Sequence, residues 1–280
     1  MRISRFLTVV LLGVLGTLGV AAPVGGAEEP GILQQAHAWG RFGKGSWRRV
    51  RIVTESFDEQ GNLTNSSTTD NKTSLEEVTP ERVTLKVEVT VEIAGQRFLS
   101  PQQIIKQGYA GENIGQTVSI KPLLPELLTI AGREIRCETQ EIEIVGGNNK
   151  EVSQISYSPQ LTPPILKRKS TMSDPISGKT TQEAMTEVYV LDKQLQVLGE
   201  ERTGFSVRQV QKNDRGSTTT VSDNVYDIPG EVVSHSSKKL DSQGRLVRRS
   251  TLELVAYGAV EDDSHRETGR MRTRRHKRTR

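Results

Sequence analysis

The sequence has 280 residues, with 38 Lys and Arg against 34 Asp and Glu, so its formal net charge is +4. Apolar residues make up 34% of the chain and aromatic residues only 4%. The one cysteine, Cys137, excludes a disulfide within the chain, so the fold must be held by its core. This composition favours an extended two-sided β domain with a thin core over a large compact enzyme.

Residues 1–27 are expected to form a cleaved signal peptide. Arg2 and Arg5 precede an apolar run over 6–20 that is too short to span a membrane comfortably. Cleavage after Ala27 would place small residues at both positions that a signal peptidase reads. We therefore expect a secreted or periplasmic protein with no transmembrane segment in the mature chain, the alternative being a membrane-anchored N-terminus.

Residues 28–48 are interpreted as an N-terminal segment. The sequence from Gly31 to Ala38 is compatible with a short helical turn. The segment also holds Trp39, Phe42 and Trp47, which are a large share of the scarce aromatic residues. We expect these rings to cap one end or edge of a sheet, or alternatively to line the mouth of a ligand site.

Residues 49–260 are predicted to form a single antiparallel β domain. The strongest signal runs from Thr84 to Ile93, where apolar and polar residues alternate strictly, as in a strand with one buried face. Similar patterns predict strands over 49–55, 135–145 and 246–257, with a β-bulge near Gln140 in the second of these. The polar stretch from Ser66 to Ser74 lacks periodicity and is expected to be a loop.

Turn signals separate these strands at short intervals, and several end in glycine. Partial internal repeats support the same layout, since 164–191 and 229–257 each contain a proline, a strand, an Asp-containing turn and a return strand. The predicted fold is therefore mainly β, with little helix. It is an antiparallel meander of paired hairpins that forms a curved sheet or open half-barrel.

Signatures of catalysis and metal binding are absent from the sequence. It contains no nucleophile elbow, no phosphate-binding loop, no zinc-protease helix and no cysteine pair. His235 lies in a predicted strand between serines that point to the opposite face, and Cys137 is interpreted as a small buried hydrophobe. We expect no enzyme activity, no metal and no cofactor.

Residues 261–280 are expected to form a disordered basic tail. Clustered cations of this kind attract polyanions. The polyanion-binding residues would be Arg270, Arg272, Arg274, Arg275, Lys277, Arg278 and Arg280. Export directs such a tail towards an anionic envelope polymer or lipid headgroup rather than nucleic acid.

The layout of two regions resembles a known group. Aromatic residues gather over 37–47, and the segment from Ile130 to Cys137 leads through a strand to Tyr157 and to Pro163–Pro164. This is similar to uncharacterised exported β-rich proteins of planctomycete-type bacteria and, more distantly, to the half-barrels of periplasmic lipoprotein carriers. The second resemblance implies an apolar concavity that holds an acyl chain. It transfers no catalytic motif and no ligand residue to this chain.

Two functions follow as hypotheses. The first is an exported non-catalytic binding or carrier module for an apolar or lipid-like ligand at the cell envelope. Its ligand-binding residues would be Leu85, Val87, Val89, Val91, Ile93, Trp39 and Trp47. The second is a structural or interaction protein of the envelope, tethered by the basic C-terminal tail.

Overall fold

The computed structural model describes residues 31–147 and 149–260. The predicted signal peptide and basic tail lie outside the described residues. The elements in chain order are α1 (Ile32–Ala36), β1 (Trp47–Phe57), β2 (Leu63–Val78), β3 (Arg82–Ile93), β4 (Gln96–Leu99), β5 (Gln103–Gly108), β6 (Thr117–Ile130), β7 (Arg133–Gly146), β8 (Asn149–Tyr157), β9 (Ile165–Ser173), β10 (Thr180–Val197), β11 (Glu200–Asn213), β12 (Gly216–Asn224), β13 (Val232–Asp241) and β14 (Leu246–Gly258).

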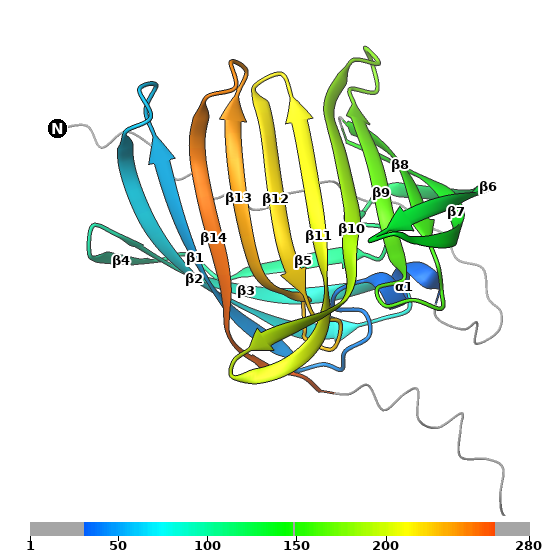
Figure 1. Ribbon diagram of the computed structural model, residues 1–280, viewed down its shortest axis with the longest axis horizontal. Coiled ribbons are helices and arrows are strands. Elements are labelled where there is room, and N and C mark those ends of the chain that lie inside the picture. The colour runs from blue at the N-terminus through cyan, green and yellow to red at the C-terminus, as the bar shows by residue number, and fades with distance from the viewer. Residues whose placement is uncertain (1–30, 148, 261–280) are drawn as a thin grey trace, which may run out of the picture.

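These strands form one 14-stranded antiparallel sheet, in the order β4-β3-β2-β1-β14-β13-β12-β11-β10-β9-β8-β7-β6, with β5 also paired to β3. From β6 to β14 every strand pairs with its neighbour in sequence, and β14 then pairs with β1. The sheet is open and curled, and in Figure 1 β3 and β5 cross behind the upright strands. The predicted meander in a curved sheet with little helix is confirmed.

A short linker explains why the sheet must curl. β5 ends at Gly108 beside β3, near one end of the sheet, and β6 begins at Thr117 at the other end. Residues 109–116 can span at most about 29 Å, whereas the same strands laid flat would extend about 58 Å. Ala110 in this linker packs against Ile142 and Ile155 of β7 and β8. The linker therefore draws the two ends of the sheet towards each other.

Both edges of the sheet contain proline. β4 and β5 pair with the two halves of β3 and are separated by 100–102, which include Pro101. The opposite edge strand, β6, contains Pro122 and Pro125. Because proline has no N–H to donate, these residues oppose the addition of a further strand at either edge.

Cross-strand partners define two faces of the sheet, and the face that carries Val50, Val91 and Leu252 is called the inner face. Partners on one face form rows, which are named here by their composition. The apolar row is Val188, Val207, Ser222, His235, Leu252, Ile52 and Thr69. The hydroxyl row is Thr186, Gln209, Thr220, Ser237, Ser250, Thr54 and Ser67. The basic row is Ala184, Gln211, Thr218, Lys239, Arg248, Ser56 and Asn65.

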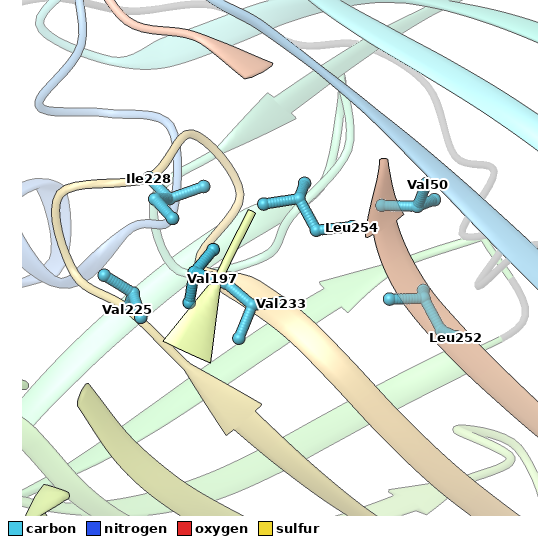
Figure 2. Close-up of a cluster of buried hydrophobic side chains, with 7 residues drawn as sticks. All are labelled: Val50, Val197, Val225, Ile228, Val233, Leu252 and Leu254. Carbon is cyan, nitrogen blue, oxygen red and sulfur yellow. The ribbon is translucent and has the colours of Figure 1, made fainter. Parts of the chain in front are cut away.

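The core is divided into several clusters rather than one. Figure 2 shows the cluster in which β1, β10, β13 and β14 pack against the segment 225–231. In that segment Val225 and Ile228 are fully buried, so it covers one end of the inner face. A second cluster joins Trp39 and Phe42 to β2 and β3. The core is thus spread along the sheet in separate clusters.

Three hairpin turns share one stabilising device, a leading aspartate whose carboxylate accepts backbone N–H groups within the turn. Asp58 accepts from Gln60 and Asn62, and Asp174 accepts from Ile176 and Ser177. Asp241 accepts from Gln243 and Arg245. Such bonds favour the ionised carboxylate, and they hold the pKa of each of these aspartates below its ordinary value.

Replacing Asp241 with alanine is expected to lower stability at neutral pH. The backbone N–H and the guanidinium of Arg245 hold the pKa of Asp241 down, so its stabilisation is present above the unfolded pKa and is lost as pH falls through the folded pKa. Thermal unfolding at neutral and acid pH should show a gap between variant and parent that closes in acid. Gln243→Ala keeps its backbone N–H and is the control. A gap that persists in acid would contradict the carboxylate as its cause.

Two sequence predictions are wrong. Residues 66–74 are the middle of β2, paired with β1 on one side and β3 on the other, and not a loop. The pairing of β7 with β8 shows no bulge at Gln140, and the nearest register shift lies in β6, between Leu123 and Glu126. The apolar pattern of β7 changes because Cys137 packs in one cluster and Ile142 in another. The strand buries opposite faces in its two halves.

Candidate functional site

An open groove of about 290 Å³ lies on the inner face over β9–β13. Its apolar lining is Ala36, Pro163, Ile165, Leu166, Val188, Phe205, Val207 and Val232. Its uncharged polar lining is Thr186, Gln209, Thr220, Ser222 and Asn224. The volume lies at the lower end of the roughly 300–1,000 Å³ typical of ligand sites. The groove can therefore hold one chain or ring, but not a whole two-chain lipid.

Strand register places the groove residues on one surface. Val188 and Val207 are direct cross-strand partners, and Val207 is in turn the partner of Ser222. Close contact between β11 and the end of β12 requires Gly204, because a Cβ added there would lie 2.3 Å from the backbone oxygen of Asn224. The neighbouring Phe205 is then buried, with 3% of its surface exposed, in the wall of the groove.

One rim of the groove is held by a largely buried ion pair. Arg41 Nη2 lies 2.8 Å from Glu231 Oε1, and both side chains are about one sixth exposed (15% and 16%). Arg41 also donates from Nε to the backbone oxygen of Tyr226 at 3.0 Å, and its guanidinium lies 3.6 Å from the ring centre of that residue. Burial raises the pKa of Glu231, and the charge of Arg41 opposes that rise.

The N-terminal segment forms part of the same rim. Ala36 of α1 lines the groove, and the hydroxyl of Tyr226 donates to the backbone oxygen of Gln35 at 2.9 Å. Arg41 Nη1 donates to the backbone oxygen of His37 at 3.1 Å, while Gly230 donates its N–H to Ala38. Hydrogen bonds thus hold the segment 225–231 against the N-terminal segment beside the groove.

Arg168 lines the groove from β9, and its charge is also paired with a carboxylate. Its Nη2 donates to Glu151 Oε1 at 3.1 Å, to Ser153 Oγ at 3.1 Å and to the backbone oxygen of Ala110 at 3.2 Å. Lys167 is the third charged residue of the lining, and its Nζ lies 3.4 Å from Glu126 Oε1. All three charged residues that line the groove, Lys167, Arg168 and Glu231, are therefore already paired. What remains available to a ligand there is apolar surface with hydroxyl and amide groups.

His235 lies in the apolar row, next to the groove residue Ser222. Its Nε2 is buried and has no hydrogen-bond partner among the described residues. Burial lowers the pKa of His235 and nearby Arg48 lowers it further, so the imidazole is neutral at neutral pH. Burial also lowers the pKa of Arg48 to about 10, and Arg48 Nη1 donates to the backbone oxygen of Gly230 at 2.6 Å.

The residues predicted to bind a ligand do not line this groove. Leu85, Val87, Val89 and Val91 are buried, with 5–7% of their surface exposed, and Ile93 is half-buried beside them. Leu85 packs with the buried Trp39 at one end of the sheet. Trp47 is the cross-strand partner of Gly258, and Lys72 Nζ lies 5.3 Å from its ring.

The sequence did not single out the residues that do line the groove. The alternation of Phe205, Val207 and Gln209 with Ser206 and Arg208 was a visible signal for β11. It could not show which strands lie beside β11 or that the lining is completed by Ala36. The predicted polyanion-binding residues of the tail lie outside the described residues, so that hypothesis stays a prediction.

Within residues 31–147 and 149–260, no group of three or more His, Cys, Asp or Glu side chains could hold a metal ion. One cluster has the residue types of a serine–lysine site, since Lys193 Nζ lies 2.7 Å from Asp223 Oδ1, to which Ser206 Oγ donates at 2.6 Å. Ser206 is fully buried, so a substrate cannot reach it. Cys137 is also fully buried, and burial raises the pKa of its thiol.

Comparison with known proteins gives distant structural likenesses only. No family model matches the chain, and no curated protein matches it. A candidate lipoprotein from Parabacteroides distasonis covers 78% of this chain and 98% of its own, at 10% identity and a TM-score of 0.33. A candidate exported protein with a YmcC-like fold from Bacteroides fragilis covers 77% and 97%, at 8% identity and a TM-score of 0.29. Likenesses this distant carry no argument about what this chain does. In the described part of the chain, no helix is long and apolar enough to cross a membrane.

Proposed function

We propose that this chain is an exported, non-catalytic binding module that holds an apolar or lipid-like ligand at the cell envelope. The groove over β9–β13 is the site, in place of the row of apolar residues on β3. The observation that carries the proposal is the combination of an apolar lining with hydroxyl and amide groups and no unpaired charge in one open hollow. Export rests on the N-terminal sequence pattern.

Filling the groove tests this function. Thr220 lines the groove, whereas the next residue in the chain, Thr219, points to the exposed outer face. The probe is N-phenyl-1-naphthylamine, an uncharged apolar fluorophore. Thr220→Trp should weaken its binding at least about tenfold, because displacing one buried apolar group costs ~1.5–3 kcal/mol.

Thr219→Trp adds the same ring on the other face and should bind the fluorophore like the parent protein. Equal binding by parent and Thr220→Trp, or no binding by the parent, would rule out the groove as an apolar site. Native mass spectrometry of gently purified protein is a second readout. A lipid carried by the parent should be lost from Thr220→Trp and retained by Thr219→Trp.

A further inference from the structure

Charge is distributed unequally between the two faces of the sheet. From β10 to β2, the apolar, hydroxyl and basic rows of the inner face contain two charged residues, Lys239 and Arg248. Arg168 of β9 extends the hydroxyl row as the cross-strand partner of Thr186, and it is paired with Glu151. The outer face of the same strands carries charges of both signs, and some of them are paired, as in Arg249 with Glu55 at 2.7 Å and Arg208 with Glu187. From β10 to β2, the inner face thus carries two cations and no carboxylate in these rows.

Lys239 and Arg248 are direct cross-strand partners on β13 and β14. Residues in this relation have Cβ atoms about 4.5–5.5 Å apart, and like charges so placed repel. Both side chains are half-buried. Neither makes an ion pair or a side-chain hydrogen bond with any described residue. An anion held between them would relieve this repulsion.

The two cations lie within reach of the groove. Lys239 is the cross-strand partner of Thr218, and Thr220 is the next inner residue along β12. Two residues of a strand span about 6.7 Å, so along the strands the basic row lies roughly that far beyond the row that contains the groove residue Thr220. Lys239 is on the strand next to β12, and Arg248 is on the strand after that. A pair of hydroxyl groups lies between the groove and the two cations, and in this pair Thr220 Oγ1 donates to Ser237 Oγ at 2.9 Å. One molecule can occupy the groove and reach both cations.

We propose that the groove and the Lys239–Arg248 pair form one site for a single-chain anionic amphiphile. Its chain lies against Val188 and Val207, and its carboxylate or phosphate group lies between Lys239 and Arg248. This inference rests on the proposed function and adds the charge of the ligand to it. The small groove volume fits one chain. Because Lys167, Arg168 and Glu231 are paired, Lys239 and Arg248 are the unpaired charges of the three inner-face rows that run beside the groove.

The test compares probes that share a chain and differ in headgroup. Dodecanoate, dodecyl phosphate and the uncharged dodecyl maltoside are each titrated below their micelle concentrations against the bound naphthylamine fluorophore. Lys239→Gln and Arg248→Gln should each weaken dodecanoate and dodecyl phosphate by roughly tenfold or more, the effect of losing a charge-assisted hydrogen bond. Binding of dodecyl maltoside should not change. Salt should weaken the anionic probes and leave the neutral one unaffected.

Lys238→Gln is the matched control, since Lys238 is the next residue on the same strand, is exposed on the outer face and makes no ion pair with a described residue. It should bind every probe like the parent. If Lys239→Gln and Arg248→Gln behave like Lys238→Gln, the anionic subsite is refuted while the groove stands. If neither the anionic probes nor dodecyl maltoside displaces the fluorophore, the proposed function fails as well.

Inorganic phosphate alone separates a headgroup from a free anion. The inference predicts that calorimetry detects much weaker binding of inorganic phosphate than of dodecyl phosphate, because the free ion gains nothing from the groove. Equal affinity of the two would overturn the amphiphile and leave a simple anion site. Dodecanoate and dodecyl phosphate have the same chain and would contact the same two cations. The tighter binder of the two therefore indicates whether the site prefers a carboxylate or a phosphate headgroup.

Discussion

Replacing Arg41 with alanine is expected to destabilise this protein by about 3–5 kcal/mol, the usual effect of removing one partner from a buried ion pair. Glu231 would lose its 2.8 Å contact and remain largely buried without a compensating charge. The backbone oxygens of Tyr226 and His37 would also lose a donor. Urea unfolding measures the effect, with Arg208→Ala as the control, because the pair of Arg208 with Glu187 is half exposed and should contribute less than about 1 kcal/mol.

The effect of Arg41→Ala should depend on pH in a defined direction. Burial raises the pKa of Glu231, so the protonated carboxyl is favoured in the folded state. The cost of its charge is absent below the unfolded pKa and grows as pH rises through the folded pKa. Without Arg41 that cost is larger, so the deficit of the variant should shrink as pH falls. A deficit that matches Arg208→Ala, or one that grows in acid, would contradict this account.

Replacing Phe205 with alanine is expected to cost about 3–5 kcal/mol. The ring is 3% exposed and packs in the cluster that contains Cys137, Leu166 and Val188, so its removal leaves a cavity beside the groove. Phe205→Leu should cost less, since more of the volume is retained. Denaturant unfolding gives both values.

The control for Phe205 is another phenylalanine on an edge strand. Phe98 of β4 is 50% exposed, so Phe98→Ala should change stability by no more than about 0.5 kcal/mol. If Phe205→Ala lowered the free energy of unfolding as little as Phe98→Ala, the Phe205 ring in the wall of the groove would contribute little to the stability of the core. The ranking Phe205→Ala, Phe205→Leu, Phe98→Ala is the expected result.

Strands with one fully apolar face could be predicted from the sequence, and strands with a polar inner face could not. Thr84 to Ile93 alternates because Val87, Val89 and Val91 are buried and their neighbours are not. Residues 66–74 looked like a loop because β2 contributes Ser67 and Thr69 to the inner face instead of aliphatic side chains. Pairing on both sides and the β propensity of threonine, not hydrophobic periodicity, hold this strand in the sheet.

The candidate site depends on register between distant segments, which explains why the sequence did not predict it. Val188, Ser222 and Ala36 come from separate parts of the chain and meet only when the sheet is complete. The alternating apolar residues of β3, from Leu85 to Ile93, form the strongest local pattern in the sequence, and for that reason the sequence predicted the ligand there. A strongly amphipathic strand indicates that one of its faces is buried. In this fold the apolar face of β3 is buried by other residues of the same protein.

The pairing of β1 with β14 has a consequence for how this protein is made. Trp47 pairs with Gly258, so the contact joins the first strand to the last. Contacts of such long sequence separation slow folding. A chain that leaves a ribosome or an export channel from its N-terminus would present one edge of β1 unpaired until residue 258 has emerged. Through that interval the exposed edge would be open to pairing with other chains, so we expect this protein to need shielding until its last strand has been made.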